Sequence, residues 1–361
     1  MSRSLDAREL SVLHDDAERC ASVAGLVYVN ADAPGWQRRR AGKGFSYRSQ
    51  GGGQLAESAR QRIASLAIPP AWTSVWICPD ADGHILATGF DERGRKQYIY
   101  HPRWRELRDM INFYRLLVIA EALPKIRAHY LAQLRRRTID KSRVIAGMIA
   151  LLDETHIRIG HDVYAEENDS YGLSTLTRRH VRLQGKSAVL SFPAKSNKAA
   201  KVSVDDPAIV RLLRQLVAQG GKRLFEVDGS PVSADEVNQA LWQLSGEHIT
   251  AKDFRTWGGT LAAFVYLRER QQAERAPAKV AIEALDEAAE QLGNTRAVAR
   301  AHYVHPHVIQ AFSTGSFGHY LRLSKPARSA LLNPDERLLA AFLKTLSDAE
   351  FSALEDAQKS A

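Results

Sequence analysis

Two cationic side chains, Lys252 and Arg255, lie three residues apart just before an apolar run at 261–267. At this spacing both side chains can share one face of a turn or an early helix, and the apolar run predicts a helix that anchors them. Two fixed cations directed at one point suit a phosphate in transfer between oxygens. Such a pair is also common on solvated helix faces, so its meaning depends on the rest of the chain.

Three further groups have matching chemistry. Arg158 lies between two isoleucines, where a solvent-facing charge would not normally occur, and Lys186 lies in the predicted hairpin turn 184–187. Tyr303 lies in the segment 294–306, near the end of a short basic helix that is expected there. Each group also has an ordinary structural explanation, because lysines are mostly exposed and helical tyrosines are commonly half-buried.

The composition points to a polyanionic partner. The chain has 361 residues, enough for two domains. Its net charge of +9, with arginine runs at 38–40, 135–137 and 178–179, favours nucleic acid over a merely basic protein. No apolar run approaches the roughly 20 residues of a membrane span, and the polar N-terminus lacks a signal-peptide core. Because two cysteines are too few for a zinc site or a disulfide framework, we expect a cytoplasmic protein with no membrane partner.

The hydrophobic pattern predicts an α+β protein in which a small antiparallel β-sheet domain precedes a larger, mainly α-helical domain. After an amphipathic helix at 5–24, β-like runs separated by turn signals extend to about residue 101. The predicted strands are 26–29, 45–47, 75–78, 85–88 and 97–100. We therefore place an N-terminal β-rich DNA-binding domain at residues 1–103.

The remainder is predicted to be helical, with one β-hairpin at 180–192. Pro124 is expected to begin a new helix after one at 105–123, because proline fits the first turn of a helix but not its interior. Further helices are predicted at 143–152, from 205–207, from the Ser233 capping box, at 279–292 and beyond 334. These elements give a catalytic domain at 104–330 and a helical C-terminal tail at 331–361.

The last strand of the first domain carries basic and aromatic side chains at its rim. Arg95 and Lys96 could hold phosphates of duplex DNA, and Gln97, Tyr98 and Tyr100 could read base edges. On a strand the two tyrosines share one face, and Gln97 lies on the other. The alternative is that the tyrosines simply cover the core.

Four segments, in this order along the chain, resemble the type IB DNA topoisomerases in the compact poxvirus-like form found in bacteria. The resemblance extends from about residue 20 to about residue 325. It rests on Gln-Tyr-Ile-Tyr-His-Pro at 97–102, Ile-Arg-Ile-Gly at 157–160 with Ser-Tyr-Gly-Leu at 170–173, Lys-Asp-Phe-Arg-Thr-Trp-Gly-Gly at 252–259 and Tyr-Val-His-Pro at 303–306.

The resemblance implies roles for the site residues. Tyr303 would attack a backbone phosphate, giving a 3′-phosphotyrosyl link and a free 5′-hydroxyl. Arg158 and Arg255 would match the paired arginines of the family, Lys186 its hairpin lysine and Lys252 the basic residue before the second arginine. The residue types fit, because arginine forks stay charged and bind phosphate oxygens bidentately. A lysine near other cations has a lowered pKa and can give a proton to the leaving oxygen.

Asn294 departs from the family pattern. Many relatives carry a histidine nine residues before the tyrosine, where this chain has Asn294. An amide can donate a hydrogen bond to a phosphate oxygen, but it cannot carry charge or readily transfer a proton. We therefore interpret Asn294 as a neutral donor to the phosphate.

The resemblance also implies an activity, the relaxation of supercoiled duplex DNA by a nick, strand rotation and resealing. The covalent link would conserve the energy of the broken bond, so no cofactor, ATP or metal would be needed. The sequence has no Gly-x-x-x-x-Gly-Lys-[Ser/Thr] loop for a nucleotide. The expected form is a monomeric two-domain clamp around DNA at the bacterial nucleoid. Two alternatives are a tyrosine recombinase, which usually has a helical N-terminal domain, and a non-catalytic DNA-binding protein, which needs no nucleophile.

Overall fold

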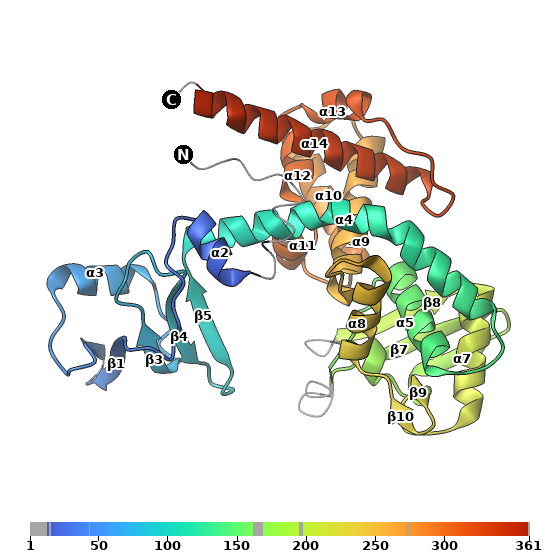
Figure 1. Ribbon diagram of the computed structural model, residues 1–361, viewed down its shortest axis with the longest axis horizontal. Coiled ribbons are helices and arrows are strands. Elements are labelled where there is room, and N and C mark those ends of the chain that lie inside the picture. Colours follow the sequence, from blue (N-terminus) through green and yellow to red (C-terminus); the bar gives the residue numbers. More distant parts are fainter. Residues whose placement is uncertain are drawn as a thin grey trace. The chain divides into compact units, whose positions relative to one another are not determined.

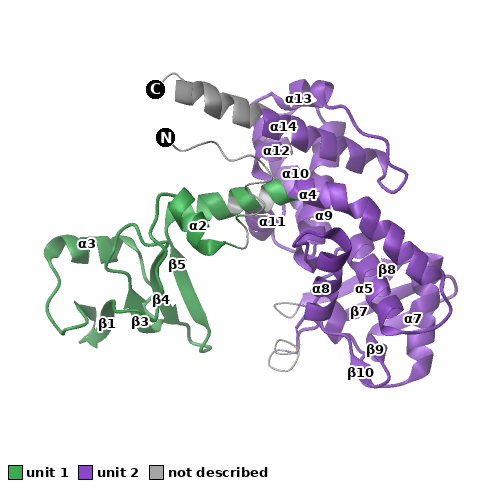
Figure 2. Cartoon of the chain, viewed as in Figure 1, with its two compact units in different colours: residues 1–115 green, residues 116–361 purple. Residues whose placement is uncertain are grey.

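The computed structural model describes residues 13, 16–42, 44–161, 169–194, 198–272 and 274–359 (Figure 1). The side chains of residues 109, 112, 113 and 349–359 lie outside this description. The chain divides into two compact units, residues 1–115 and 116–361 (Figure 2). The clamp and the domain boundaries after residues 103 and 330 stay predictions.

The first unit is built on a five-stranded antiparallel sheet in the order β2-β1-β3-β4-β5, which confirms the predicted small antiparallel sheet. The strands are β1 (Trp36–Ala41), β2 (Gly44–Arg48), β3 (Thr73–Ile77), β4 (Ile85–Phe90) and β5 (Lys96–Tyr100). Helix α3 (Glu57–Ser65) supplies Ile63 to a core that includes Val75 and Ile77 of β3. Ile99 of β5 packs against this core, so the neighbours of Ile99 along the strand lie on the opposite face.

In this unit one strand was missed and one predicted strand was wrong. The arginine run 38–40 lies in β1, which was not predicted because three successive arginines show no apolar alternation. Arg38 is held there by hydrogen bonds to three backbone carbonyls of the segment 68–72. The segment 26–29, predicted as a strand from its apolar residues, makes one isolated β-bridge instead. Of the helix predicted at 5–24, the described part is α2 (Ala17–Val23).

Helix α4 (Pro102–Arg135) runs from the first unit into the second and contains Pro124 in its interior. The prediction of two helices that meet at Pro124 was therefore wrong. A proline in mid-helix loses one hydrogen bond and normally breaks or kinks the helix. Here Leu123 and Ile126 are both fully buried, so packing on each side of the proline holds both halves of the helix in place. Tertiary packing outweighs the local preference.

The second unit is mainly helical, as predicted. Its helices are α5 (Lys141–Thr155), α7 (Pro207–Gln219), α8 (Ala234–Ser245), α9 (Ala251–Glu269), α10 (Pro277–Gln291), α11 (Arg296–His302), α12 (Pro306–Ser313), α13 (Phe317–Leu323) and α14 (Pro334–Lys359). The helix starts follow the sequence signals. Asp206 caps α7 through the amides of Ala208 and Ile209, and Ser233 forms a capping box with Glu236.

The predicted hairpin is present but belongs to a larger sheet. Strands β6 (Val181–Gln184) and β7 (Ser187–Ala194) form the hairpin, and β8 (Lys198–Val204) pairs with β7 to complete three antiparallel strands. The short strands β9 (Glu226–Val227) and β10 (Ser230–Pro231) form a separate pair. The prediction of a single β interruption was therefore incomplete. Strand β8 was not predicted because it is rich in alanine and lysine, which are uncommon in strands.

The tail forms one helix, α14, which packs on the body of the second unit. Phe342 of α14 lies in an aromatic cluster with Phe264 of α9 and Phe317 of α13, at ring-centroid distances of 5.1 Å and 4.7 Å. All three rings are almost fully buried. Burial of such rings stabilises the fold by roughly 2 kcal/mol each. Among the residues that the structure describes, every helix is too short or too polar to cross a bilayer.

Candidate active site

Arg255 is a buried cation fixed by backbone carbonyls. It lies in the second turn of α9, whose start is capped by Thr250 and Asp253 in a capping box. Arg255 is 4% exposed; Nη1 donates to the carbonyl of His156, and Nη2 to that of Leu292 at 2.9 Å. A further donor, Nε, is buried and has no partner among the described protein atoms. A buried donor without a partner is rare in folded proteins, so this one is available to a substrate oxygen.

Arg158 is carried by an extended segment that a second segment holds from the side. The amide of Leu173 donates to the Arg158 carbonyl at 2.8 Å, and the amide of Ser174 donates to the carbonyl of Ile159 at 2.7 Å. The two backbones approach so closely because both contact residues are glycines. A Cβ at Gly160 would lie 2.8 Å from the Cα of Gly172, and Gly160 has a φ of +80°. The sequence pairing of Ile-Arg-Ile-Gly with Ser-Tyr-Gly-Leu thus has a direct structural cause.

Asn294 joins Arg158 at the end of α10. Its Oδ1 accepts a hydrogen bond from Nη2 of Arg158, and its backbone amide donates to the carbonyl of Ala289 at 2.8 Å. Its Nδ2 is buried and has no described partner. Because the oxygen is used by the arginine, the amide nitrogen is the group that remains free to donate. This orientation fits the neutral donor predicted for this position.

Tyr303 caps the C-terminal end of α11 and is held close to α9. Its carbonyl accepts a hydrogen bond from Oγ1 of Thr260 at 3.2 Å. A Cβ at Gly259 would lie 2.8 Å from that carbonyl oxygen, so a glycine is required at this contact. The guanidinium carbon of Arg255 lies 4.9 Å from the centre of the Tyr303 ring. The nucleophile candidate and the buried arginine are therefore in direct contact.

The surroundings of Tyr303 favour its phenolate. Burial alone would raise the pKa of the phenol, since it disfavours a charge. The charge of Arg255 and a hydrogen bond from it, with the charges of Arg158 and Lys252, outweigh burial and place the pKa below its ordinary value. The pKa of Arg255 is lowered by burial and then by the charge of Arg158. These effects show that the four side chains form one electrostatic cluster.

The two lysines predicted for the site differ in position. Lys252 lies exposed in the first turn of α9, where its charge acts on Tyr303. Lys186 lies exposed in the turn between β6 and β7, and the neighbouring carbonyl of Gly185 accepts a hydrogen bond from Arg214 at 2.6 Å. Within the part of the chain that the structure describes, no hydrogen bond or ion pair joins Lys186 to the cluster.

The sequence pattern did not single out several residues that build the site. Arg255 is fixed by the carbonyls of His156 and Leu292. Tyr303 is fixed by the hydroxyl of Thr260 and by its close approach to Gly259, which has no side chain. The one available signal was the pair of glycines that follows Trp257, because glycines allow close packing. A Cβ at Gly258 would overlap the His156 ring, and one at Gly259 would meet the Tyr303 carbonyl.

His305 is a structural histidine. It is 8% exposed, and burial lowers its pKa to about 3, so its ring is neutral at physiological pH. Its Nδ1 accepts a hydrogen bond from the amide of His307 at the start of α12. A helix cap of this kind explains the histidine without a chemical role.

Of the five residues predicted to contact DNA, Arg95 lies just before β5 and the other four lie on it. Arg95 and Gln97 both donate to Oδ2 of Asp91, at 2.9 Å and 3.0 Å, and Arg95 holds the pKa of that carboxyl at about 2. Lys96 lies 3.8 Å from a carboxylate oxygen of Asp32. The rings of Tyr98 and Tyr100 stack at 5.7 Å, and Tyr98 is 41% exposed, so the pair lies on the face opposite Ile99.

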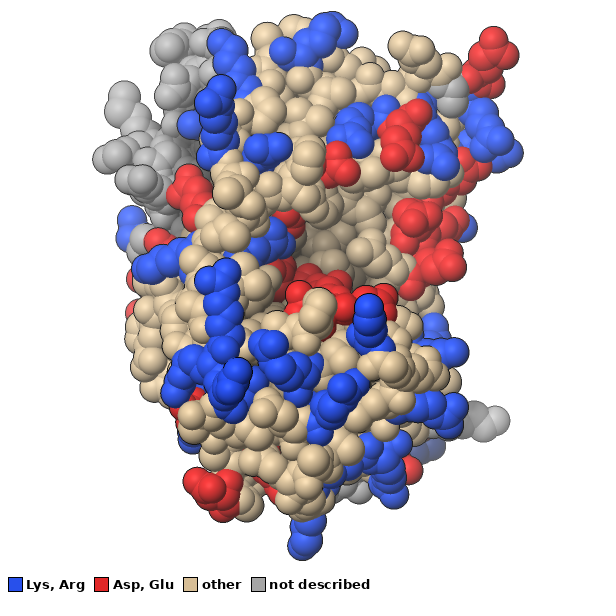
Figure 3. All heavy atoms as spheres, turned by 90° about the vertical axis from the view of Figure 1, so that its right-hand side faces the viewer, with Lys and Arg blue, Asp and Glu red and all other residues tan. Residues whose placement is uncertain are grey.

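Charge alone does not locate the site. Figure 3 shows Lys and Arg side chains over a wide part of one face, with Asp and Glu side chains around a hollow above them. The distinguishing property of the Tyr303 cluster is instead that one of its cations, Arg255, is buried and fixed by backbone carbonyls. Among the described residues, no group of three or more His, Cys, Asp or Glu side chains could hold a metal ion. The prediction of a metal-free reaction stays a prediction.

Comparison with known proteins identifies the class of enzyme. Residues 101–316 match the family model of the eukaryotic DNA topoisomerase I catalytic core, and residues 44–91 match that of the bacterial DNA topoisomerase IB N-terminal domain. The fold and the cluster thus belong to an enzyme that acts on DNA topology.

Individual relatives agree. The DNA topoisomerase 1B of Acanthamoeba polyphaga mimivirus is 31% identical over 266 residues, which cover 70% of this chain and 79% of that protein. The DNA topoisomerase 1B of vaccinia virus (strain Copenhagen) is 23% identical over 187 residues, 48% of this chain and 54% of that protein. The chain belongs to the type IB DNA topoisomerase family.

Proposed function

We propose that this topoisomerase cleaves one DNA strand through a covalent bond between Tyr303 and a 3′-phosphate. The observation that carries the proposal is the cluster itself. A phenol with a lowered pKa lies against Arg255, within reach of the charges of Arg158 and Lys252. Two buried donors, Nε of Arg255 and Nδ2 of Asn294, have no described protein partner. Preorganised donors of this kind stabilise charge that develops on phosphate oxygens.

In the proposed reaction the Tyr303 phenol gives its proton to water, its oxygen attacks phosphorus, and the bond from phosphorus to the 5′-oxygen breaks. Arg158, Arg255 and Asn294 bind the non-bridging oxygens. The leaving 5′-oxygen takes a proton from a lysine, and Lys186 on its hairpin turn is the candidate that the family resemblance supplies, with Lys252 as a second cation. The free 5′-hydroxyl later attacks the phosphotyrosine, so the strand is resealed and Tyr303 is regenerated.

This scheme needs neither ATP nor a metal ion, because the phosphotyrosine keeps the energy of the broken bond. Between cleavage and resealing the cut strand can rotate about the intact one, which relaxes supercoils of either sign. We propose that the enzyme acts as a monomer that closes on duplex DNA as a clamp. In that arrangement Arg95 and Lys96 would contact phosphates and Gln97, Tyr98 and Tyr100 would contact bases. The match to a bacterial N-terminal domain supports a bacterial nucleoid as the site of action.

Plasmid relaxation tests the proposal. Negatively supercoiled plasmid is incubated with the native protein in EDTA without ATP, beside Tyr303→Phe. Phenylalanine keeps the ring in place and removes the nucleophilic oxygen. We expect a ladder of relaxed topoisomers from the native protein alone. Relaxation by Tyr303→Phe, or a requirement for ATP or a metal ion, would contradict the proposed mechanism.

A further inference from the structure

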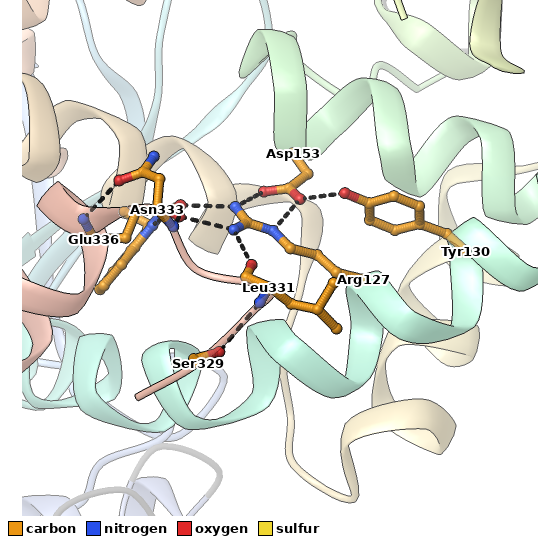
Figure 4. Close-up of polar contacts among 8 residues, drawn as sticks. Arg127, Tyr130, Asp153, Ser329, Leu331, Asn333 and Glu336 are labelled. Carbon is orange, nitrogen blue, oxygen red and sulfur yellow. Dashed lines mark hydrogen bonds and ion pairs between the residues drawn. The ribbon is translucent and has the colours of Figure 1, made fainter. Parts of the chain in front are cut away.

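A buried ionic network lies behind the catalytic cluster, centred on Arg127 of α4 (Figure 4). Its Nε and Nη2 donate to Asp153 of α5 at 2.7 Å and 2.9 Å, and its Nη1 and Nη2 donate to Glu336 of α14 at 2.8 Å and 2.7 Å. Nη1 also donates to the carbonyl of Leu331 at 2.7 Å. Arginine has five N–H donors, and these five bonds use all of them. The network therefore joins three elements through one guanidinium.

The two carboxylates are as well satisfied as the arginine. Asp153 also accepts a hydrogen bond from the Tyr130 hydroxyl at 2.8 Å, and Glu336 also accepts one from the Asn333 amide at 2.8 Å. The side chains of Asp153 and Glu336 are 5% and 4% exposed. Burial by itself would raise the pKa of Glu336, but Arg127 outweighs it and keeps the carboxyl ionised. Buried polar networks with every group paired are rigid.

One arm of the network reaches the helix that carries Arg255. Oε1 of Glu336 accepts a hydrogen bond from Nε1 of Trp257 at 3.3 Å, and Trp257 is 1% exposed. Trp257 follows Arg255 by two residues on α9. The bond therefore fixes the rotation of α9 close to the catalytic arginine.

The second arm reaches the carbonyl to which Arg255 is bonded. Asp153 lies in the last turn of α5, which ends at Thr155, and the next residue, His156, is the acceptor for Nη1 of Arg255. The His156 ring lies against Gly258, where a Cβ would overlap it. Arg127 thus holds both the helix that bears Arg255 and the turn that anchors its guanidinium.

From these contacts we infer that Glu336, on the C-terminal helix, is a positioning residue for Arg255. It acts through Trp257 and, with Arg127 and Asp153, keeps the guanidinium directed at the scissile phosphate. The inference rests on the catalytic role proposed above for Arg255. It assigns a function to the start of the C-terminal helix, which lies after the matched catalytic core at 101–316. Misplacing a catalytic group by about 1 Å can slow a reaction by about 100-fold, so positioning at this level matters.

Two substitutions separate positioning from folding. Glu336→Gln keeps the shape of the side chain and removes the charge that pairs with Arg127. Trp257→Phe keeps an aromatic ring in the core and removes the N–H that Glu336 accepts. The matched control is Asp335→Asn, which removes an ion pair between Asp335 and Arg268 that also joins α14 to α9 but is partly exposed.

The measurement is single-turnover cleavage of a short duplex at saturating protein, beside equilibrium DNA affinity and thermal melting. We expect cleavage by Glu336→Gln to be slower by about 10- to 100-fold and by Trp257→Phe by about fivefold, with DNA affinity changed less than about twofold. Asp335→Asn should cleave like the native protein. If Glu336→Gln does not fold, the cleavage rate of Trp257→Phe tests the inference instead. A folded Trp257→Phe protein that cleaves at the native rate would overturn the inference.

A pH profile and a double-mutant cycle show whether the effect passes through Arg255. Because the Arg255 charge lowers the pKa of Tyr303, Glu336→Gln should move the rise of the cleavage rate to higher pH, and Asp335→Asn should not. In an Arg255→Ala background Glu336→Gln should add less than about a twofold loss, since coupled residues are not additive. Full additivity would overturn the inference. Native cleavage by Arg255→Ala itself would instead contradict the proposed function.

Discussion

The catalytic cluster and the rim of β5 use the same residue types in opposite ways. In the cluster, Arg255 is buried and bonded to two backbone carbonyls, so its free donor Nε has a fixed direction. At the start of β5, Lys96 and the preceding Arg95 are exposed and paired with carboxylates of their own unit, Asp32 and Asp91. A neutral carbonyl anchors an arginine and leaves its charge for the substrate, whereas a carboxylate neutralises it.

This difference suits the cluster to catalysis on DNA and the rim of β5 to binding of DNA. Catalysis needs donors that do not move when charge develops, and burial against carbonyls provides that. Binding to a polyanion needs charges that exchange one partner for another, and exposed ion pairs of about 0–1 kcal/mol are easily exchanged. Substitutions in the cluster should therefore change the rate of cleavage, and substitutions at the rim should change affinity.

The largest effect is expected for Arg255→Ala. Removing a fixed donor from a charged transition state typically slows a reaction by about 10²- to 10³-fold, and we expect that loss in single-turnover cleavage. DNA affinity should change by less than about threefold, because Arg255 is only 4% exposed. Equal losses of affinity and rate would break the proposed division between the two regions.

Gly259→Ala should have the next largest effect. Its Cβ would lie 2.8 Å from the carbonyl oxygen of Tyr303, so the backbone that carries the nucleophile must move. We expect cleavage to slow by about 10- to 100-fold, measured under single turnover. The control is Ala262→Gly on the same helix, which lowers stability by about 1 kcal/mol without contacting Tyr303. A comparable loss of rate in both variants would attribute the effect to stability alone.

The pH dependence of cleavage should show the charges around Tyr303. Because its pKa is lowered, the phenolate fraction at a given pH is larger, and the rate should level off below the ordinary tyrosine pKa of about 10. Lys252→Gln removes one of the cations, so the pKa should rise and the plateau should move to higher pH. Arg268→Gln, a cation at the far end of the same helix, should leave the profile unchanged. A plateau that does not move in Lys252→Gln would show that its charge does not act on the nucleophile.

The smallest effect is expected for Asp91→Asn at the rim. The substitution frees Arg95 and Gln97 from their shared carboxylate, so DNA should bind about two- to fivefold more tightly, with a steeper dependence on salt. The rate of cleavage at saturation should not change. Titration of a labelled duplex at several salt concentrations measures both quantities, and a weaker affinity would indicate that Asp91 orients these side chains for DNA rather than competing with it.

The sequence singled out residues that lie close together but missed parts of the fold around them. Arg158, Arg255 and Tyr303 lie in quoted motifs, and the glycines of the first two motifs allow the close backbone approaches at the site. Local signals failed where packing decides, as at Pro124 inside α4. The pairing of Arg127 with Glu336 joins residues 209 positions apart, and no local sequence pattern predicts such a contact.

The most direct test of the central claim is to locate the covalent bond to DNA. The native protein is incubated with a duplex and denatured during turnover, and the trapped adduct is digested and sequenced by mass spectrometry. We predict that a 3′-phosphate end of the DNA is attached to the peptide that contains Tyr303, and that the other DNA fragment ends in a 5′-hydroxyl. Attachment at another residue, or at a 5′-phosphate, would contradict the account.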